Sequence, residues 1–161
     1  MEKTTSRPTW DQVWLQVAHA VAQRSRCTRA SMGAVIVSAQ ERISATGYNG
    51  AAASYKGDGD CVNWCERARG VTSLNGNYDG CPSIHAEANA LLYVDRSQIE
   101  NGTIYVTAPP CMHCAKLISN SGLRRVVVMI GVADAHRTPE IALDYLRDCG
   151  ITVTTFERDA T

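Results

Sequence analysis

Two short motifs contain the side chains best suited to chemistry. The first is His85-Ala86-Glu87, and the second is Pro110-Cys111-Met112-His113-Cys114. One imidazole and two thiolates are preferred zinc ligands, and three protein ligands leave the fourth tetrahedral position open for water. An open position is typical of a catalytic zinc rather than a structural one. The motifs therefore predict a zinc site built from His85, Cys111 and Cys114.

The spacing within the motifs assigns separate roles to these residues. Cys111 and Cys114 are three positions apart, which places both sulfurs on one face of a helix. The N-terminal end of a helix also favours anionic thiolates. Glu87 follows His85 by two residues, so its carboxylate can reach a water molecule in the open position without binding the metal. We therefore predict Glu87 as the catalytic acid and base.

Each motif alone has simpler interpretations. A His-x-Glu pair is common on solvated helices, and a single Cys-x-x-Cys also fits a redox pair or half of a zinc ribbon. Here both occur in the order H-x-E…P-C-x-x-C, each at a predicted helix start, which is the signature of zinc-dependent nucleobase deaminases. In that chemistry Glu87 would take a proton from water, protonate the ring nitrogen and deliver a proton to the departing ammonia. His113 is expected beside the site or at the surface, because one imidazole is already assigned.

The elements that position the motifs follow from hydrophobic periodicity and turn residues. Helical spacing predicts a first helix from Trp10 to about Gln23. Strands are predicted at Gly33–Val37, Arg42–Tyr48, Thr103–Thr107, Arg125–Ile130 and Ile151–Thr155, and further helices at His85–Val94, Cys111–Asn120 and Pro139–Asp148. Strands that alternate with helices imply crossover connections and a partly parallel sheet. We predict an α/β fold, a three-layer α/β/α domain that spans residues 1–161.

The segment from Asn49 to Ile84 fits no periodic element. It is rich in Gly, Asp and Asn, and so long a loop inside a compact domain needs a stabilising or functional reason. Four cysteines could supply that reason as a closed structural zinc site: Cys27, Cys61, Cys65 and Cys81. The alternative is four buried or reactive free thiols. The remaining cysteine of interest, Cys149, is expected in the core.

Composition restricts the class of protein. Lys+Arg and Asp+Glu both number 16 in a chain of 161 residues, so the formal net charge is zero. This balance argues against a large surface for duplex nucleic acid. Residues 1–10 lack the apolar stretch of a signal peptide, and no apolar run is long enough to span a bilayer. Seven cysteines without an export signal indicate reduced thiols. We expect a cytoplasmic protein without a membrane partner.

The sequence resembles the deoxycytidylate (dCMP) deaminase family within the cytidine deaminase-like superfamily. The matching segments are Ser25–Arg29, Gly33–Val37, Thr46–Gly50, Ile84–Ala90 and Pro110–Lys116. The match extends from about Trp10 to Val153. The zinc motifs are common to the whole superfamily, whereas Gly-Tyr-Asn-Gly and Ser-Arg-Cys single out the deoxycytidylate branch.

The resemblance implies hydrolysis of dCMP to dUMP and ammonia, a mixed five-stranded sheet and one catalytic zinc. It also implies a homo-oligomer, a hexamer in several members, and regulation by dCTP and dTTP. Some members have a second zinc on the Ser-Arg-Cys cysteine and loop residues, which supports the four-cysteine site.

The resemblance also assigns substrate contacts. Asn49 would hold the sugar and the base edge, the backbone around Ala86 would contact the pyrimidine, and the carbonyl of Pro109 would meet the departing amine. Arg26 is the candidate for the 5′-phosphate, because a guanidinium makes forked, charge-assisted hydrogen bonds to phosphate. The alternative for Arg26 is an ordinary surface charge.

One segment departs from the family pattern. Members usually carry an aromatic residue after the fourth strand, where it packs on the base, and Ala133 lies near that position within Gly131–Arg137. Either the pocket is roomier or His136 replaces the ring. The alternative functions are therefore deamination of a C5-modified cytosine nucleotide or of another nucleobase. A non-catalytic zinc module that binds nucleic acid is disfavoured by the neutral charge and by Glu87.

Overall fold

A mixed five-stranded sheet forms the centre of the molecule, with the strand order β2-β1-β5-β6-β7. The structure is a computed structural model that describes residues 7–55, 61–63, 65–66, 68–70, 81–131 and 139–157. The strands are β1 (Gly33–Val37), β2 (Ile43–Tyr48), β5 (Thr103–Val106), β6 (Arg125–Ile130) and β7 (Thr152–Glu157). β1 runs antiparallel to β2 and β5, whereas β5, β6 and β7 are parallel to one another. The predicted fold class is confirmed.

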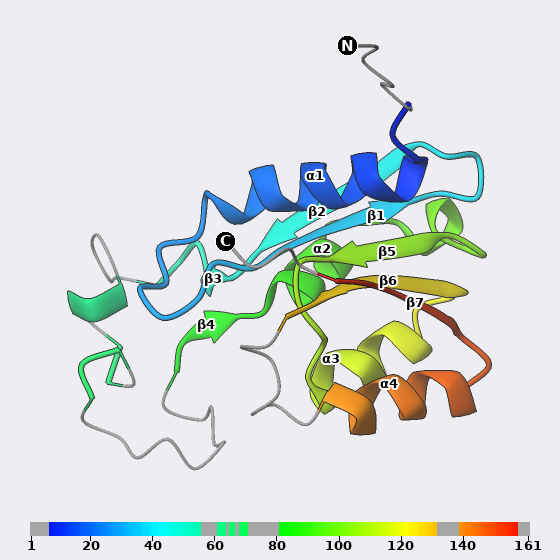
Figure 1. Cartoon of the computed structure of the whole chain (residues 1–161). Helices are drawn as coiled ribbons and strands as arrows, with labels where there is room; N and C mark the ends of the chain where they lie inside the picture. Colours follow the sequence, from blue (N-terminus) through cyan, green and yellow to red (C-terminus); the bar gives the residue numbers. More distant parts are fainter. Residues whose placement is uncertain are drawn as a thin grey trace, which may run out of the picture.

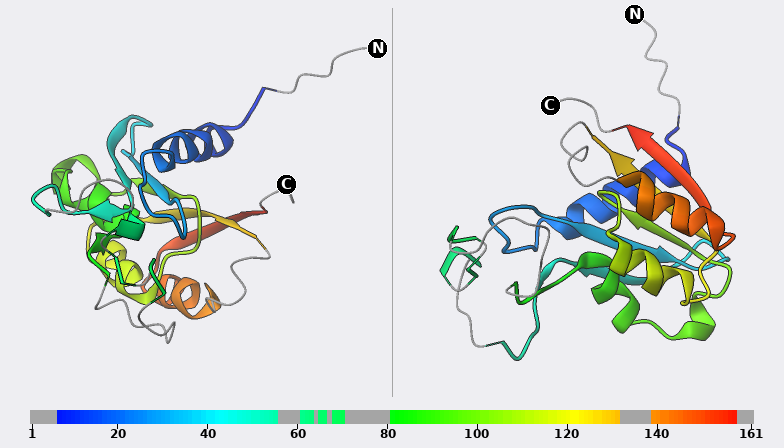
Figure 2. Two further views of the ribbon diagram at one scale, coloured as in Figure 1. Left: turned by 90° about the vertical axis from the view of Figure 1, so that its left-hand side faces the viewer. Right: turned by 90° about the horizontal axis from the view of Figure 1, so that it is seen from below.

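Helices cover both faces of this sheet (Figure 1). α1 (Trp10–Ala22) lies on one face, and α2 (Ala86–Leu92), α3 (Met112–Ser119) and α4 (Pro139–Asp148) lie on the other (Figures 1 and 2). α3 connects β5 to β6, and α4 connects β6 to β7, so each parallel pair is joined by a helical crossover. The result is the three-layer α/β/α arrangement expected from the alternation of elements.

Strand alternation divides the core into two layers. Val35, Tyr105 and Val127 point to the α1 face, where they pack with Leu15 and Ala18. The neighbouring residues on the same strands point to the opposite face and pack against α2, α3 and α4. Because β1 and the centre of β6 are buried on both faces, their sequences are continuous apolar runs rather than alternating ones.

Two glycines allow the helices to approach the sheet closely. A Cβ on Gly47 would collide with the backbone carbonyl of Ala86 and the backbone nitrogen of Ala90 in α2. A Cβ on Gly33 would collide with the carbonyl of Ala18 in α1. Gly47 therefore lets the N-terminal half of α2, which carries the first motif, lie directly on β2.

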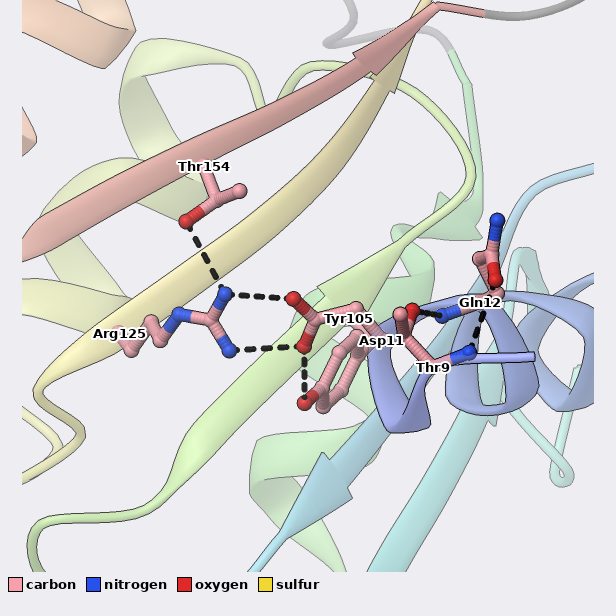
Figure 3. Close-up of polar contacts among 6 residues, drawn as sticks. All are labelled: Thr9, Asp11, Gln12, Tyr105, Arg125 and Thr154. Atoms are coloured by element: carbon pink, nitrogen blue, oxygen red, sulfur yellow. Dashed lines mark hydrogen bonds and ion pairs between the residues drawn. The ribbon is translucent and has the colours of Figure 1, made fainter. Parts of the chain in front are cut away.

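A polar cluster fixes the start of α1 to the sheet (Figure 3). Thr9 caps the helix in a reciprocal capping box with Gln12. Arg125 donates two hydrogen bonds to the Asp11 carboxylate, at 2.8 and 2.7 Å, and a third to Thr154 Oγ1 at 3.1 Å. The Tyr105 hydroxyl donates to Asp11 at 2.9 Å. Residues of β5 and β6 therefore meet the Asp11 carboxylate of α1, and Arg125 links this group to β7.

Several boundaries and short elements differ from the sequence prediction. The second and third helices begin one residue later than predicted, because His85 and Cys111 are N-cap residues with extended backbone. The last strand covers Thr152–Glu157 rather than 151–155. The structure adds a two-stranded antiparallel pair, β3 (Gly50–Ala51) with β4 (Ser83–Ile84), and 3-10 turns at Cys61–Asn63 and Arg96–Gln98. Elements of two or three residues are too short to show periodicity.

The prediction that Cys149 lies in the core is wrong, because its side chain is exposed. α4 ends at Asp148, and Gly150 follows with φ 77°, so Cys149 lies in the turn that leads away from the packed face of the helix. The residues that α4 buries are Ala142, Leu143 and Leu146.

Among the helices of the described residues, none combines the length and apolar character needed to cross a bilayer.

Candidate active site

The two sequence motifs meet at the N-terminal ends of α2 and α3. His85 and Cys111 are the N-cap residues of these helices, with φ, ψ of −71°, 154° and −74°, 166°. Neither side chain forms a capping hydrogen bond to the helix that follows it. Cys114 lies in the first turn of α3 and is buried. Both helix ends therefore present soft donor atoms to one point.

The geometry of these three donors fits a zinc ion. His85 Nδ1 lies 3.5 Å from Cys111 Sγ and 3.5 Å from Cys114 Sγ. All three donor atoms lie within 4.8 Å of one another. Tetrahedral zinc, with Zn–S of about 2.3 Å and Zn–N of about 2.0–2.1 Å, separates a nitrogen and a sulfur ligand by about 3.6 Å. The donor set and the spacing therefore match a zinc site with a fourth position left for a non-protein ligand.

The protonation of the two thiols also suits a cation. The hydrogen bond from Cys114, with a further contribution from His85, lowers the pKa of Cys111 to about 3. The same contact with Cys111, together with burial, raises the pKa of Cys114. One thiolate is thus formed readily, and the second is disfavoured mainly because it would lie beside the first. A divalent cation between the two sulfurs would favour both thiolates.

Glu87 lies in the first turn of α2 and is only 7% exposed. Burial raises the pKa of its carboxyl, and the positive charge of His85 offsets part of that rise. Cys114 is in contact with the carboxyl, so Glu87 borders the donor set. A raised pKa brings a carboxyl closer to the pH at which an enzyme works, which is the direction of shift that suits a general acid and base.

The structure places Asn49 at the end of β2, with its side chain nearly buried. Its Oδ1 accepts a hydrogen bond from the Met32 backbone nitrogen at 2.7 Å, and its Nδ2 donates to the Ala30 carbonyl at 2.8 Å. Asn49 therefore shapes the segment before β1, a role that the sequence did not indicate. One amide hydrogen and one lone pair of the side chain are not used by these two bonds.

The other predicted substrate residues lie in different surroundings. Ala86 is buried at the start of α2, and Pro109 is buried in the connection between β5 and Cys111. Arg26 is exposed in the segment after α1, where its carbonyl accepts a hydrogen bond from Cys61. His113 is exposed on α3, at the surface. Ala133 and His136 lie outside the described residues.

Thr107 is a structural contributor that sequence reasoning missed. Its buried hydroxyl accepts a hydrogen bond from Gly33 N at 3.0 Å, and its own N–H donates to the Gly33 carbonyl at 3.1 Å. These bonds tie the end of β5, just before Pro109 and Cys111, to the start of β1. A single threonine at a strand end belongs to no motif, so no sequence signal marked it.

The four further cysteines lie in one neighbourhood. Cys65 Sγ and Cys81 Sγ are 3.8 Å apart, and Cys61 Sγ accepts a hydrogen bond from the Thr28 backbone at 3.2 Å, beside Cys27. Burial is the main cause that raises the pKa of Cys81, and Cys65 and Cys27 add to it. Within the described part of the chain, only the set of His85, Cys111 and Cys114 brings three donor atoms within 4.8 Å.

Comparison with known proteins agrees with this geometry. Residues 8–130 match the model of the cytidine and deoxycytidylate deaminase zinc-binding region. The chain is 46% identical over 123 residues to the deoxycytidylate deaminase of Mycobacterium phage D29, covering 76% of this chain and 95% of that protein. It is 35% identical over 152 residues to the deoxycytidylate deaminase of Saccharomyces cerevisiae, covering 93% of this chain but 46% of the yeast protein.

A solved structure shows the same fold. The crystal structure of dCMP deaminase from the cyanophage S-TIM5, in complex with dCMP and dUMP, has a TM-score of 0.70 and 26% identity. The match covers 94% of this chain and 99% of that one. The family region and the fold of this chain therefore both agree with those of deoxycytidylate deaminases.

Proposed function

The chain belongs to the cytidine and deoxycytidylate deaminase family, and on that premise we propose that it hydrolyses dCMP to dUMP and ammonia. The observation that carries the proposal is the meeting of His85, Cys111 and Cys114 beside the buried carboxyl of Glu87. Relatives named deoxycytidylate deaminase and a neighbour that binds dCMP and dUMP support the choice of substrate.

His85, Cys111 and Cys114 would hold the zinc ion, which when bound polarises water and lowers its pKa toward neutrality. Glu87 would accept the proton that water loses and pass it to N3 of the cytosine ring. The oxygen of that water would form a bond to C4. Glu87 would then take the remaining proton from this oxygen and deliver it to the exocyclic amine as the C4–N bond breaks and the C4 carbonyl forms. In sum, one water molecule is consumed and one ammonia molecule is released, so atoms and charge balance.

Substrate contacts are proposed on the matched positions. Asn49 would hold the sugar and base edge with the donor and acceptor capacity left by its bonds to Ala30 and Met32. The Ala86 backbone would contact the pyrimidine, and the Pro109 carbonyl would meet the departing amine. Arg26 is exposed, which is compatible with a contact to the 5′-phosphate of a substrate. These four assignments rest on the family resemblance.

A substrate panel tests the proposal. Loss of absorbance and release of ammonia are measured with dCMP, 5-methyl-dCMP, dCTP, deoxycytidine and guanine. We expect dCMP to be preferred over deoxycytidine, and Arg26→Ala to remove most of that preference. Loss of one charged hydrogen bond is worth about 1.5–3 kcal/mol, which is roughly a tenfold to hundredfold change in kcat/KM. Equal rates on dCMP and deoxycytidine would contradict the phosphate assignment.

The alternative substrates give different outcomes in the same panel. If the position of Ala133 leaves a roomier pocket, 5-methyl-dCMP should be tolerated, because a methyl group in an apolar pocket changes selectivity by only about 1–3 kcal/mol. A higher kcat/KM for 5-methyl-dCMP or for guanine than for dCMP would identify that compound, rather than dCMP, as the substrate. No turnover of any compound would favour the non-catalytic zinc module.

We further propose a second, structural zinc bound by Cys27, Cys61, Cys65 and Cys81. The 3.8 Å separation of Cys65 and Cys81 and the attachment of Cys61 beside Cys27 support this site. Metal binding would fix a segment that has little core of its own. Elemental analysis should then give close to two zinc ions per chain, and Cys65→Ser should lower thermal stability more than kcat. One zinc per chain in metal-replete protein would contradict the second site.

The proposal includes a homo-oligomer, a hexamer as in several family members, and dCTP and dTTP as effectors. An apolar hollow of about 310 Å³ supports association, and it lies where α2 ends beside α3. Leu92 and Tyr93, at 70% and 76% exposure, stand at the end of α2, and a second copy bound there would cover these side chains. Light scattering gives the mass in solution, and the rate with added dCTP or dTTP tests regulation.

The cytoplasm, where thiols stay reduced, is the proposed location.

A further inference from the structure

One hydrogen bond joins α2 to the end of β2 beside the site. Asn89 Nδ2 donates to the Tyr48 carbonyl at 2.7 Å. The backbone N–H of Asn89 donates to the His85 carbonyl at 2.9 Å, which closes the first turn of α2. Asn89 therefore connects the N-cap residue of α2 to the strand end that precedes Asn49.

The peptide unit between Tyr48 and Asn49 is held from both sides. Its carbonyl accepts from Asn89, and its N–H donates to the Met32 carbonyl at 3.2 Å. Because a peptide unit is planar, fixing both of its polar groups fixes its orientation and with it the direction in which the Asn49 side chain leaves the backbone. The orientation of this peptide unit therefore also sets where the Asn49 side-chain amide can reach Ala30 and Met32, to which it is hydrogen-bonded.

The contact between α2 and β2 needs such a directional bond. The helix lies on Gly47 through Ala86 and Ala90, so small residues bring the backbones close but provide no interlocking side chains. Apolar contact is non-directional, whereas a hydrogen bond fixes one atom of the helix against one atom of the strand. Asn89 also stands where alanine would be the better helix former. Its hydrogen bond to Tyr48 explains an asparagine in this position.

We propose that Asn89 is a positioning residue for deamination, which sets Asn49, directly after β2, relative to His85 and Glu87 at the start of α2. The inference rests on the proposed function, because it assumes that Asn49 contacts the substrate. Asn89 itself does not touch the reacting atoms in this account. Its loss should weaken substrate binding without removing the zinc or the proton carrier.

The test is Asn89→Ala, compared with the unaltered protein and with Ser119→Ala. The Ser119 hydroxyl donates to Lys116 O within α3 and lies 3.4 Å from the Tyr145 hydroxyl, so this control removes helix hydrogen bonds that do not reach β2. Steady-state rates with dCMP, zinc content and thermal unfolding are measured for all three. Because the higher helix propensity of alanine offsets part of the loss of one neutral hydrogen bond, Asn89→Ala should still fold, with a thermal unfolding temperature at most slightly below that of the parent.

We expect Asn89→Ala to raise KM for dCMP by roughly threefold to tenfold, the effect of one neutral hydrogen bond, with kcat and zinc content close to the parent. Ser119→Ala should leave KM unchanged. An unchanged KM in Asn89→Ala, or a fall in kcat that follows loss of zinc, would overturn the positioning role.

Amide hydrogen exchange separates this inference from the proposed function. The Asn49 amide, which donates to Met32, should exchange faster in Asn89→Ala and at the parental rate in Ser119→Ala. This measurement needs no turnover, so it decides the positioning role even if the parent fails to deaminate dCMP. Unaltered exchange of the Asn49 amide in Asn89→Ala would overturn the inference.

Discussion

Two carboxyl groups occupy the same local position on opposite faces of the sheet. Asp11 is the second residue of α1, and Glu87 is the second residue of α2. The N-terminal end of a helix favours a negative charge at both positions. Nevertheless the hydrogen bonds from Arg125 hold the pKa of Asp11 below its usual value, whereas burial raises the pKa of Glu87. Tertiary surroundings, not helix position, therefore decide the protonation of each group.

The difference corresponds to two roles. Asp11 accepts two hydrogen bonds from Arg125 and one from Tyr105, so its charge is fully used to join α1 to the sheet (Figure 3). Glu87 borders a donor set for zinc, where its carboxyl is desolvated and ready to gain or lose a proton. A paired carboxylate contributes to stability, and a desolvated one is available for chemistry.

Glu87→Gln should give the largest effect. The amide preserves the shape of the side chain but cannot carry protons, so turnover of dCMP should fall by about 10²–10⁴-fold or more. Zinc content should stay at the parental level because Glu87 is not one of the three donors. Thermal unfolding should be unchanged or shifted upward, since a buried carboxyl is removed. Near-normal turnover in this variant would refute the proton-transfer role.

Asp11→Asn should have the converse effect. Replacing the carboxylate removes the charge that Arg125 faces, and partly buried pairs of this kind are worth about 1–3 kcal/mol. Denaturant unfolding should therefore show a lower free energy of unfolding at neutral pH. kcat on dCMP should stay at the parental value, because the cluster lies on the α1 face. A stable variant with reduced kcat would show that the two regions are not separate.

The pH dependence of stability sharpens the same comparison. The folded-state pKa of Asp11 is below its unfolded value of 3.8, so its contribution is complete at pH values above about 3.8. That contribution is lost as the pH falls through the lower, folded-state pKa. The free-energy difference between the parent and Asp11→Asn should accordingly shrink in acid. A difference that stays constant down to strongly acidic pH would contradict the assignment of the pair.

The smallest effect is expected from the exposed pair on α4. Arg147 donates to Asp144 at 2.6 Å, but the two side chains are 44% and 65% exposed. Solvent screens such a pair, and its contribution is about 0.5 kcal/mol or less. Asp144→Asn is therefore the control for Asp11→Asn, with the same chemical change in an exposed setting. An equal loss of stability in both variants would contradict the claim that partial burial makes the Asp11–Arg125 pair stronger than the exposed pair.

The sequence predicted the elements that show hydrophobic periodicity and the residues whose types and spacing suit a metal. Continuous or alternating apolar residues placed the five strands of the sheet, and Arg125–Ile130 and Pro139–Asp148 were predicted with the observed bounds. His85, Cys111 and Cys114 were predicted as a donor set because zinc accepts few residue types at few spacings, and their donor atoms lie within 4.8 Å of one another. Such local rules are readable without the fold.

Long-range hydrogen bonds could not be predicted in this way. The bond from Asn89 to Tyr48 and the pair of Asp11 with Arg125 join residues 41 and 114 positions apart. Thr107 and Gly33 are likewise brought together only by the pairing of β1 with β5. The end of α4 at Asp148 was predicted, but the exposure of Cys149 was not, because a residue beyond the last helical turn no longer follows the periodicity that marks the buried face.

The most direct test of the account is the restoration of dCMP turnover by zinc. The purified protein is stripped of metal with a chelator, and the rate of dCMP loss is measured before and after addition of Zn²⁺, with Glu87→Gln treated in parallel. We predict that the stripped parent is inactive, that zinc restores the formation of dUMP and ammonia, and that Glu87→Gln binds zinc without regaining turnover. A zinc-replete parent that does not consume dCMP, or a Glu87→Gln protein that does so at the parental rate, would contradict this prediction.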